Sequence, residues 1–174
     1  NPQWVHFGAG NIFRAFPAAL QQKLLNEGIE KTGIIVAEGY DYEIIKKAYR
    51  PQDDLSLLVT LKANGTIEKT VIGSLAESLT VDRHDAADWN RLKEIFASNT
   101  LQMVSFTITE KGYSITSPDG AFRADVKADF EAGPENADSY IGKLAALCYW
   151  RYTQGAAPLA LVSMDNCSHN GDKL

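Results

Sequence analysis

The sequence predicts an α/β fold, with a doubly wound, mostly parallel sheet, helices on its faces and one inserted β-hairpin. Short, continuous apolar runs at residues 4–7, 33–38, 102–109 and 159–164 are typical of strands buried on both sides of a parallel sheet. Segments with helical periodicity separate these runs, and that alternation indicates strand–helix–strand units. A chain of 174 residues is long enough for one such domain.

The first strand–helix–strand unit is predicted over residues 4–38. A helix is expected over residues 11–26, and Gly28 is its expected stop because glycine is favoured just beyond a helix end. Pro17 lies inside this pattern and is expected to kink the helix or to begin a second one.

The segment that follows has β character. Two β-rich runs, at residues 55–62 and 66–74, flank Asn64-Gly65, and Asn-Gly between such runs is the strongest short signal for a hairpin. We expect this hairpin to be an insertion that extends the edge of the sheet.

The second half of the chain is predicted to be mostly helical between its strands. Amphipathic helices are expected at residues 85–97 and 139–154, and a short helix is expected to begin near Gly171. Residues 117–136 are rich in Pro, Gly and Asp and are expected to form a loop.

The composition excludes several classes of function. A net charge of −5 argues against nucleic acids and anionic membranes as partners. No apolar run approaches the length of a membrane span, and the first residues carry no secretion signal. Cys148 and Cys167 do not make a disulfide framework, which favours a cytoplasmic location. The three histidines are scattered, so no zinc site is expected.

The most informative segment joins the first strand to the first helix. Phe7 ends the apolar run, and Gly8-Ala9-Gly10 follows directly. Gly8 permits a tight turn, and Gly10 lets a pyrophosphate approach the backbone where the helix begins. Arg14, one helical turn later, suits a phosphate or a carboxylate. The third glycine of the usual dinucleotide fingerprint is replaced by Phe13, so an ordinary strand-to-helix turn is the alternative.

Two acids, Glu38 and Asp41, follow the second strand. An acid about 20 residues beyond the glycine turn accepts hydrogen bonds from the ribose hydroxyls of NAD and repels the 2′-phosphate of NADP. Either acid suits this function. Either also suits the cap of a helix over residues 42–48.

The third and fourth strands end in polar segments. Thr107 and Glu110 are candidates to contact a nicotinamide ribose or a substrate, although Glu110 and Lys111 also suit a solvated turn. The amide of Asn166 can donate to a developing alkoxide or a carbonyl oxygen. The alternative for the last segment is a capped turn before a helix, and His169, a candidate general base, fits that alternative better.

Three segments carry a joint resemblance to one enzyme family. Residues 8–15 read Gly-Ala-Gly-Asn-Ile-Phe-Arg-Ala, residues 107–113 read Thr-Ile-Thr-Glu-Lys-Gly-Tyr, and residues 163–171 begin Ser-Met-Asp-Asn and end Asn-Gly. In this order they resemble the Gly-x-Gly-Asn-Phe-x-Arg-Ala, Thr-x-Thr-Glu-x-Gly-Tyr and Ser-Cys-Asp-Asn…Asn-Gly segments of the polyol-specific long-chain dehydrogenases, the mannitol dehydrogenase family. That family's glycine turn also lacks the third glycine.

The resemblance implies a zinc-independent enzyme that transfers a hydride between NAD and a secondary alcohol or ketone. The implied substrate is a sugar alcohol or a hexuronate, of the mannitol/fructose or mannonate/fructuronate type. Residues 1–174 would be the NAD-binding, Rossmann-like domain, and Asn166 would help to bind the reacting oxygen. The catalytic lysine would lie in a helical C-terminal domain outside this chain, which alone is expected to be inactive. The expected cofactor-binding residues are Phe7, Gly8, Gly10, Asn11, Ile12, Arg14, Glu38, Asp41, Thr107 and Glu110.

Two other functions remain open from the sequence. The chain could be a non-catalytic module that senses NAD, or a domain for another nucleotide such as adenosylmethionine. The polar end of the fourth strand favours the enzyme, because a sensor does not need it. The helix start at residues 11–14 favours a pyrophosphate-containing ligand.

Overall fold

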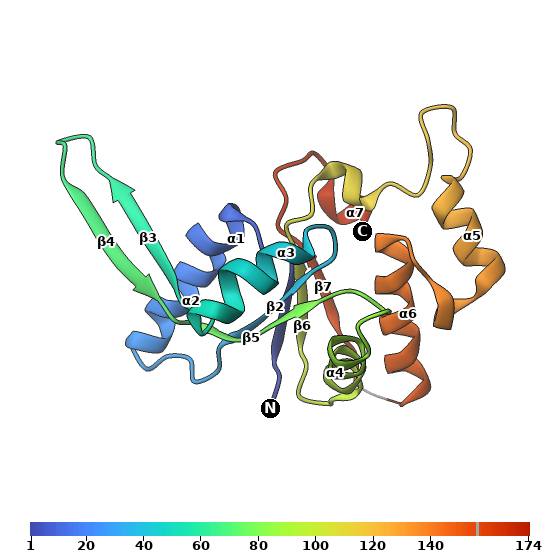
Figure 1. Ribbon diagram of the computed structural model, residues 1–174, viewed down its shortest axis with the longest axis horizontal. Coiled ribbons are helices and arrows are strands. Elements are labelled where there is room, and N and C mark those ends of the chain that lie inside the picture. Colours follow the sequence, from blue (N-terminus) through green and yellow to red (C-terminus); the bar gives the residue numbers. More distant parts are fainter. Residues whose placement is uncertain (156) are drawn as a thin grey trace.

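The centre of the molecule is a parallel sheet of five strands. The computed structural model describes residues 1–155 and 157–174 (Figure 1). The sheet has the strand order β5-β2-β1-β6-β7, and every neighbouring pair is parallel. Its strands are β1 (Trp4–Phe7), β2 (Ile34–Glu38), β5 (Leu75–Thr80), β6 (Met103–Phe106) and β7 (Ala160–Ser163). The predicted fold class is therefore confirmed.

The strand order places a crevice between β1 and β6. From β1 the chain proceeds to β2 and β5 on one side, and it then returns to β6 and β7 on the other side. The connection after β1 therefore leads to one side of the sheet, and the connection after β6 leads to the other side. In open α/β sheets the ligand binds at this point, beyond the carboxyl ends of the two central strands.

Helices cover the sheet on both faces, each over its own apolar core (Figure 1). One core joins β2 to the helices near the N-terminus, through Ile34, Val36 and Phe13. The other joins β1, β2 and β6 to later helices. The helices are α1 (Asn11–Ala15), α2 (Pro17–Asn26), α3 (Tyr42–Ile44), α4 (Ala86–Ala97), α5 (Ala124–Ala132), α6 (Tyr140–Thr153) and α7 (Asn170–Lys173). Shorter helical segments are η1 (Ile45–Tyr49), η2 (Arg50–Gln52), η3 (Glu110–Tyr113) and η4 (Pro134–Asn136).

The first helix divides where its proline predicts. Phe16 ends α1 and also precedes α2, whose first residue is Pro17. A backbone hydrogen bond of 2.9 Å from Leu20 to Phe16 continues the helical path across this junction. Gly28 has a φ of +71°, so the expected glycine stop after α2 is confirmed.

Two elements depart from the sequence prediction. The strand β5 was not predicted, because its sequence LAESLT mixes polar with apolar residues and follows a hairpin. Residues 117–136 were predicted to be a loop, but they contain α5 and η4. The helix α5 buries only Val126 and Asp129, so its apolar periodicity is weak. The Asp129 carboxylate accepts hydrogen bonds from the backbone N–H groups of Asp138 and Ser139, which connects α5 to the start of α6.

The predicted hairpin forms, but it does not extend the main sheet. Its strands β3 (Ser56–Leu61) and β4 (Ile67–Ile72) pair only with each other and project away from the domain (Figure 1). The prediction of an edge extension was therefore wrong. One face of the hairpin keeps its apolar side chains exposed, among them Leu57, Leu61 and Val71.

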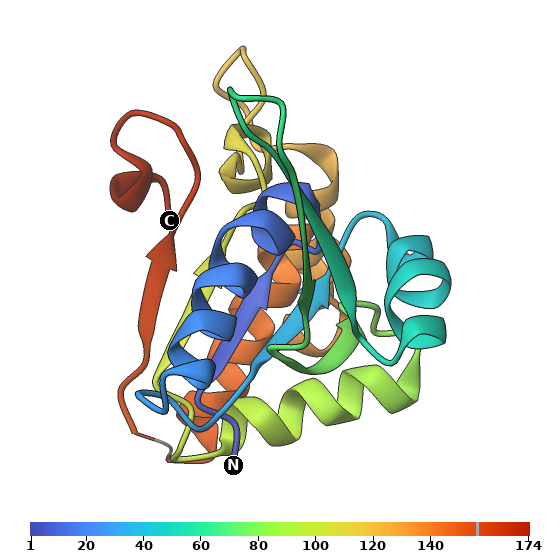
Figure 2. The same cartoon turned by 90° about the vertical axis from the view of Figure 1, so that its left-hand side faces the viewer.

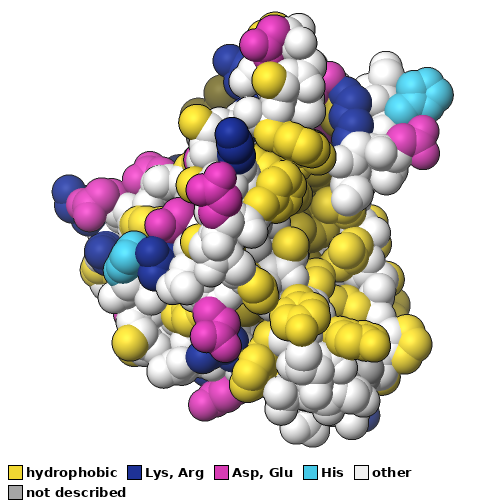
Figure 3. Space-filling model, turned by 90° about the vertical axis from the view of Figure 1, so that its right-hand side faces the viewer, with side chains coloured by type: hydrophobic (Ala, Val, Ile, Leu, Met, Phe, Trp, Pro, Cys, Tyr) yellow, Lys and Arg dark blue, Asp and Glu magenta, His cyan; other side chains and the backbone are white. Residues whose placement is uncertain are grey.

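A second apolar surface lies on the side of α5 and α6. Figure 3 shows hydrophobic side chains gathered over this face of the molecule. Phe122, Phe130, Tyr149 and Tyr152 are all exposed there. None of the described helices combines the length and the apolar character that a membrane crossing requires.

Candidate functional site

The glycine turn after β1 contains two glycines with different surroundings. Gly8 has a φ of +110°, and a Cβ built on it would lie 2.4 Å from the backbone oxygen of Thr107. Gly8 is therefore needed for the close approach of two strand ends. A Cβ built on Gly10, by contrast, would have nothing within 4 Å. The space in front of Gly10 is open at the point where α1 begins.

The start of α1 presents backbone donors to that open space. Asn11, Ile12 and Phe13 form its first turn, in which the N–H groups have no partner within the helix. Asn11 and Ile12 are exposed, whereas Phe13 is fully buried and anchors the helix to the sheet. Free N–H groups at such a turn are suited to the oxygens of a phosphate.

Arg14 adds a positive charge beside the same turn. Its guanidinium donates to Asn11 Oδ1 at 2.5 Å and lies 5.8 Å from the ring centre of Tyr49. Within residues 1–155 and 157–174, no carboxylate forms an ion pair with Arg14. Its charge thus remains available to an anionic ligand near Gly10.

Glu38 holds the glycine turn from the end of β2. Its Oε2 accepts a hydrogen bond of 2.8 Å from Ala9 N, and its Oε1 accepts from the N–H groups of Tyr40 and Asp41 at 2.8 Å and 3.3 Å. The residue is only 7% exposed. Tyr49, whose pKa is raised by burial, donates its hydroxyl to Ala9 O at 2.7 Å. The backbone N–H and the backbone C=O of Ala9 are therefore both hydrogen-bonded to side chains from other elements.

Asp41 is placed differently from Glu38. It is exposed and precedes α3, and its side chain makes no capping hydrogen bond to that helix. Of the two acids that the sequence predicted at this position, Glu38 is engaged by the protein's own backbone, whereas Asp41 faces solvent.

Asp165 joins the loops that follow β6 and β7, and the sequence pattern did not single out its role. Its carboxylate accepts hydrogen bonds from Ile108 N and Thr109 N at 2.9 Å and 3.0 Å. It also accepts from the hydroxyl of Tyr113 at 2.6 Å. Burial and the neighbouring Asp165 raise the pKa of Tyr113, which keeps this hydroxyl protonated as a donor. The signals in the sequence were the position of Asp165 directly after a strand and its place in the Ser-Met-Asp-Asn segment.

Replacing Asp165 with alanine is expected to lower the free energy of unfolding by about 2–3 kcal/mol, because two backbone N–H groups and one hydroxyl would lose their acceptor. Urea denaturation of the purified chain measures this loss. Asp119→Ala is the matched control, since Asp119 accepts only a local hydrogen bond from Ala121 N in an exposed turn. Equal stability of the two variants would contradict the proposed connection.

The remaining predicted residues lie around these two loops. Glu110 is exposed and forms an ion pair with Lys173 of α7. Asn166 is exposed, and its side chain makes none of the described hydrogen bonds. His169 has a φ of +52°, and its Nδ1 lies 3.5 Å from Asp172 within the same turn. The structure therefore brings Thr107 next to the glycine turn, whereas Glu110 and Asn166 are exposed in the loops that follow β6 and β7.

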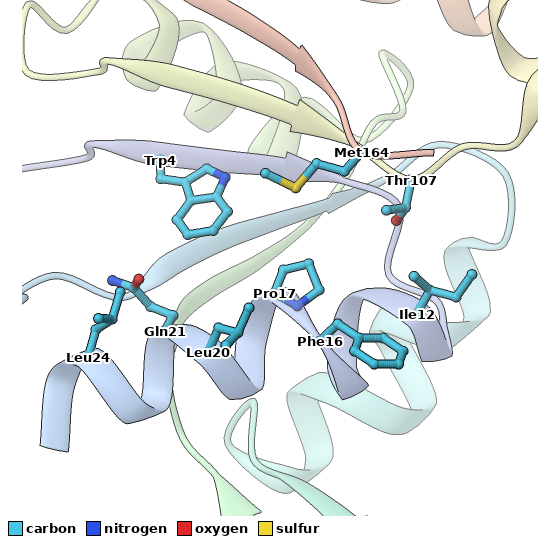
Figure 4. Close-up of a pocket in the computed structure, with 9 residues that line it drawn as sticks. All are labelled: Trp4, Ile12, Phe16, Pro17, Leu20, Gln21, Leu24, Thr107 and Met164. Atoms are coloured by element: carbon cyan, nitrogen blue, oxygen red, sulfur yellow. The ribbon is translucent and has the colours of Figure 1, made fainter. Parts of the chain in front are cut away.

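An apolar groove runs from the glycine turn down the sheet (Figure 4). Its volume is about 460 Å³. Ile12 of α1, Leu20 of α2 and Phe16 between these helices line one side. Trp4 of β1 and Met164, the residue after β7, line the other side. Figure 2 shows β7 at the sheet edge beside α2, without a helix drawn over it on this side. The leucines of α2 thus partly face this groove rather than the core.

The three histidines are dispersed in the fold. His6 is fully buried, whereas His84 and His169 are exposed. In the part of the chain that the structure describes, no group of three or more His, Cys, Asp or Glu side chains is arranged to hold a metal ion.

The chain is similar to one family of dehydrogenases along nearly its whole length. The family model for the mannitol dehydrogenase Rossmann domain matches residues 2–174. A D-mannonate oxidoreductase from Thermotoga maritima is 51% identical over 99% of this chain. A polyol:NADP oxidoreductase from Gluconobacter oxydans is 31% identical over 98% of it. Among solved structures, mannitol 2-dehydrogenase from Pseudomonas fluorescens, in a ternary complex with NAD and D-mannitol, superimposes with a TM-score of 0.82 at 29% identity over 99% of this chain.

These similarities cover one part of longer proteins. The matched region is 32% of the Thermotoga protein, 35% of the Gluconobacter protein and 35% of the Pseudomonas chain. The 174 residues therefore span about a third of the length of the proteins they resemble.

Proposed function

This chain belongs to the mannitol dehydrogenase Rossmann-domain family, and from that premise we propose that it is the NAD-binding domain of a longer, zinc-independent dehydrogenase. The substrate would be a polyol or a sugar acid, of the mannitol/fructose or mannonate/fructuronate type. When bound, NAD would accept the hydride from the substrate. We place the enzyme in the cytoplasm, in keeping with the free thiols of Cys148 and Cys167.

The observation that carries this proposal is the open space at Gly10. A Cβ at this position would have no protein atom within 4 Å, so the fold itself does not require a glycine there. The space is bordered by the N–H groups of Asn11 and Ile12 and by the guanidinium of Arg14. These groups are suited to a pyrophosphate, which has the charge and the oxygens to accept from them. Gly8 and Phe7 support the turn from the end of β1.

We assign different tasks to the two acids after β2. Glu38 keeps the glycine turn in place, because its two oxygens accept from three backbone N–H groups. Asp41 is the acid that would accept from the adenosine ribose, because it is exposed and free of capping contacts. A carboxylate at that position repels the 2′-phosphate of NADP. The Gluconobacter relative carries NADP in its name, so the preference between NAD and NADP has to be measured on this chain.

The experiment is a calorimetric titration of the purified chain with NAD and with NADP. The wild type is expected to bind NAD more tightly. Asp41→Asn should reduce the ratio of the affinity for NAD to the affinity for NADP by roughly fivefold to thirtyfold. This factor is the equivalent of about 1–2 kcal/mol for one hydrogen bond to a charged group.

Glu38→Gln is the matched comparison for Asp41→Asn. Glu38→Gln should lower the affinity for NAD and for NADP by the same factor. The reason is that the glutamine amide has one acceptor oxygen and cannot accept from both Ala9 N and Tyr40 N through separate oxygens. If Glu38→Gln alone narrowed the preference, Glu38 and not Asp41 would contact the ribose. If the wild type bound neither cofactor, the proposed function would be wrong.

The remainder of the enzyme is proposed from the longer relatives. By resemblance, the catalytic lysine lies in a helical C-terminal domain, and the 174-residue chain alone would not turn over polyols. Asn166 would donate to the reacting oxygen, and Glu110 would contact the nicotinamide half of the cofactor. The apolar groove beside β7 is a suitable surface for that domain, because Phe16 and Leu20 would otherwise remain 64% and 63% exposed.

The alternative of a non-catalytic NAD-sensing module is not favoured. The relatives that match nearly the whole chain are named as oxidoreductases or dehydrogenases.

A further inference from the structure

Four side chains beneath the glycine turn form a continuous chain of hydrogen bonds. Trp4 and His6 come from β1, and Ser105 and Thr107 come from β6 and the residue after it. Trp4 Nε1 lies 2.7 Å from Ser105 Oγ, which lies 2.7 Å from His6 Nδ1. His6 Nε2 in turn lies 2.9 Å from Thr107 Oγ1. This series of hydrogen bonds leads from the interior of the sheet to the edge of the proposed cofactor site.

The direction of the first two bonds follows from what each group can do. The indole N–H of Trp4 can only donate, so Ser105 Oγ accepts from it. Ser105 is fully buried, and His6 Nδ1 is the other partner that the structure gives its hydroxyl. The hydroxyl hydrogen of Ser105 must therefore point at His6 Nδ1, because a buried hydroxyl hydrogen without an acceptor is rarely tolerated.

The third bond follows from the protonation of His6. The ring is fully buried and stacks on Phe13 with 4.3 Å between ring centres. Burial lowers the pKa of His6 to about 3, so the imidazole is neutral and carries one hydrogen. Since Nδ1 accepts from Ser105, that hydrogen is on Nε2, which donates to Thr107 Oγ1.

The hydroxyl of Thr107 is left with a free hydrogen. Its described hydrogen bond is the one it accepts from His6. Thr107 is half-buried and lies at the end of the apolar groove near Ile12 and Met164 (Figure 4). Its backbone also packs against Gly8 of the turn. A donor in this position lies at the groove that begins beside the glycine turn.

We propose that Trp4, Ser105 and His6 orient the hydroxyl of Thr107 as a donor to an oxygen of the bound dinucleotide. His6 is a positioning residue, and Thr107 is the residue that contacts the ligand. This inference rests on the proposed cofactor function. The acceptor is either an oxygen of the ADP-ribose part or the carboxamide oxygen of the nicotinamide, and the binding experiment separates the two.

The first test needs no ligand. Nitrogen-15 NMR of the chain with labelled histidine reports which ring nitrogen of His6 carries the hydrogen. The expected result is a neutral ring protonated on Nε2 at pH 7. A ring protonated on Nδ1 would overturn the proposal, because Thr107 would then donate to His6 and have no hydrogen left for a ligand.

The second test measures the affinity for NAD and for ADP-ribose. Thr107→Val, which keeps the shape of the side chain, should weaken NAD by about three- to tenfold, the loss expected for one neutral hydrogen bond. Thr107→Ser should restore it. Thr153→Val, which removes a hydroxyl bonded to Trp150 O at the far end of α6, is the control and should bind as the wild type does.

The outcomes of this second test discriminate between acceptors. A loss of affinity for NAD alone assigns the acceptor to the carboxamide of the nicotinamide, and an equal loss for ADP-ribose assigns it to the ADP-ribose part that both ligands share. Unchanged binding of both ligands by Thr107→Val would overturn the proposal while leaving the cofactor function intact. A wild type that binds neither ligand would overturn both.

The third test addresses His6 directly. His6→Phe keeps a ring that can stack on Phe13 but removes both nitrogens. In the double variant with Thr107→Val, the loss of NAD affinity should be no greater than in Thr107→Val alone, because both changes interrupt one chain of bonds. Additive losses would contradict the coupling. If His6→Phe did not fold, the NMR and Thr107 measurements would still decide the proposal.

Discussion

Replacing Gly10 with valine is expected to abolish NAD binding and to leave the fold intact. A valine side chain would occupy the space in front of α1, where a pyrophosphate would accept from the helix N–H groups. Loss of several hydrogen bonds to a charged group, each worth about 1.5–3 kcal/mol, corresponds to a reduction in affinity of at least about 100-fold. Calorimetric titration with NAD measures the affinity, and circular dichroism with thermal melting measures the fold.

The neighbouring glycine provides the contrast. Gly8→Ala should destabilise or unfold the chain, because its Cβ would lie 2.4 Å from Thr107 O and its φ is +110°. Gly10→Ala should fold normally and weaken NAD less than Gly10→Val, since the methyl group fills less of the space. Normal NAD binding by a folded Gly10→Val variant would show that the pyrophosphate lies elsewhere.

The second large effect is a loss of stability in acid that originates from His6. Burial lowers the pKa of this imidazole from its ordinary value of 6.5 to about 3. Below pH 6.5 the unfolded chain takes up a proton that the folded chain does not, so the free energy of unfolding decreases as the pH falls from about 6.5 towards 3. Above about pH 6.5 the imidazole is neutral in both the folded and the unfolded chain, so His6 no longer lowers the free energy of unfolding. A shift of this size corresponds to about 5 kcal/mol over the whole range, and about 2 kcal/mol of it is expected between pH 7 and pH 5.

Urea denaturation at pH 7 and pH 5 tests this effect, since few carboxylates titrate in that interval. His6→Phe is expected to be less stable than the wild type at pH 7, because Ser105 and Thr107 lose their partner, but to show a much smaller decrease on going to pH 5. His84→Gln, which removes an exposed imidazole, should retain the wild-type decrease. An undiminished decrease in His6→Phe would show that other groups cause the acid sensitivity.

Much of the fold could be predicted from the sequence because many elements carry local signals. Asn64-Gly65 determines the hairpin turn, and Pro17 and Gly28 determine where α2 begins and ends. The apolar runs of β1, β2 and β6 are largely buried between the two layers of helices and so contain few polar residues. The run of β7 was also predicted to be a buried strand, but its residues are exposed or half-buried because β7 lies at the edge of the sheet.

Elements stabilised mainly by distant contacts escaped prediction. The helix α5 is held by Asp129, which accepts from residues at the start of α6. The strand β5 pairs with β2 along one edge and has Glu77 and Ser78 in its middle, so its composition is not that of a buried strand. In both cases the stabilising partner lies in a different part of the chain, so the composition of the element itself does not predict the contact.

The sequence by itself determined which residues gather at the strand ends, and tertiary structure decided what each of them does. The glycine turn, the acids after β2 and Thr107 after β6 were all predicted from residue types and spacing. Only the packed structure shows that Gly8 is closely packed while Gly10 is open. The hydrogen bonds that separate Glu38 from Asp41, and those that orient Thr107 through His6, join residues 29 and 101 positions apart. Such bonds depend on directions and distances of a few ångströms between distant segments, and these exist only once the sheet has formed.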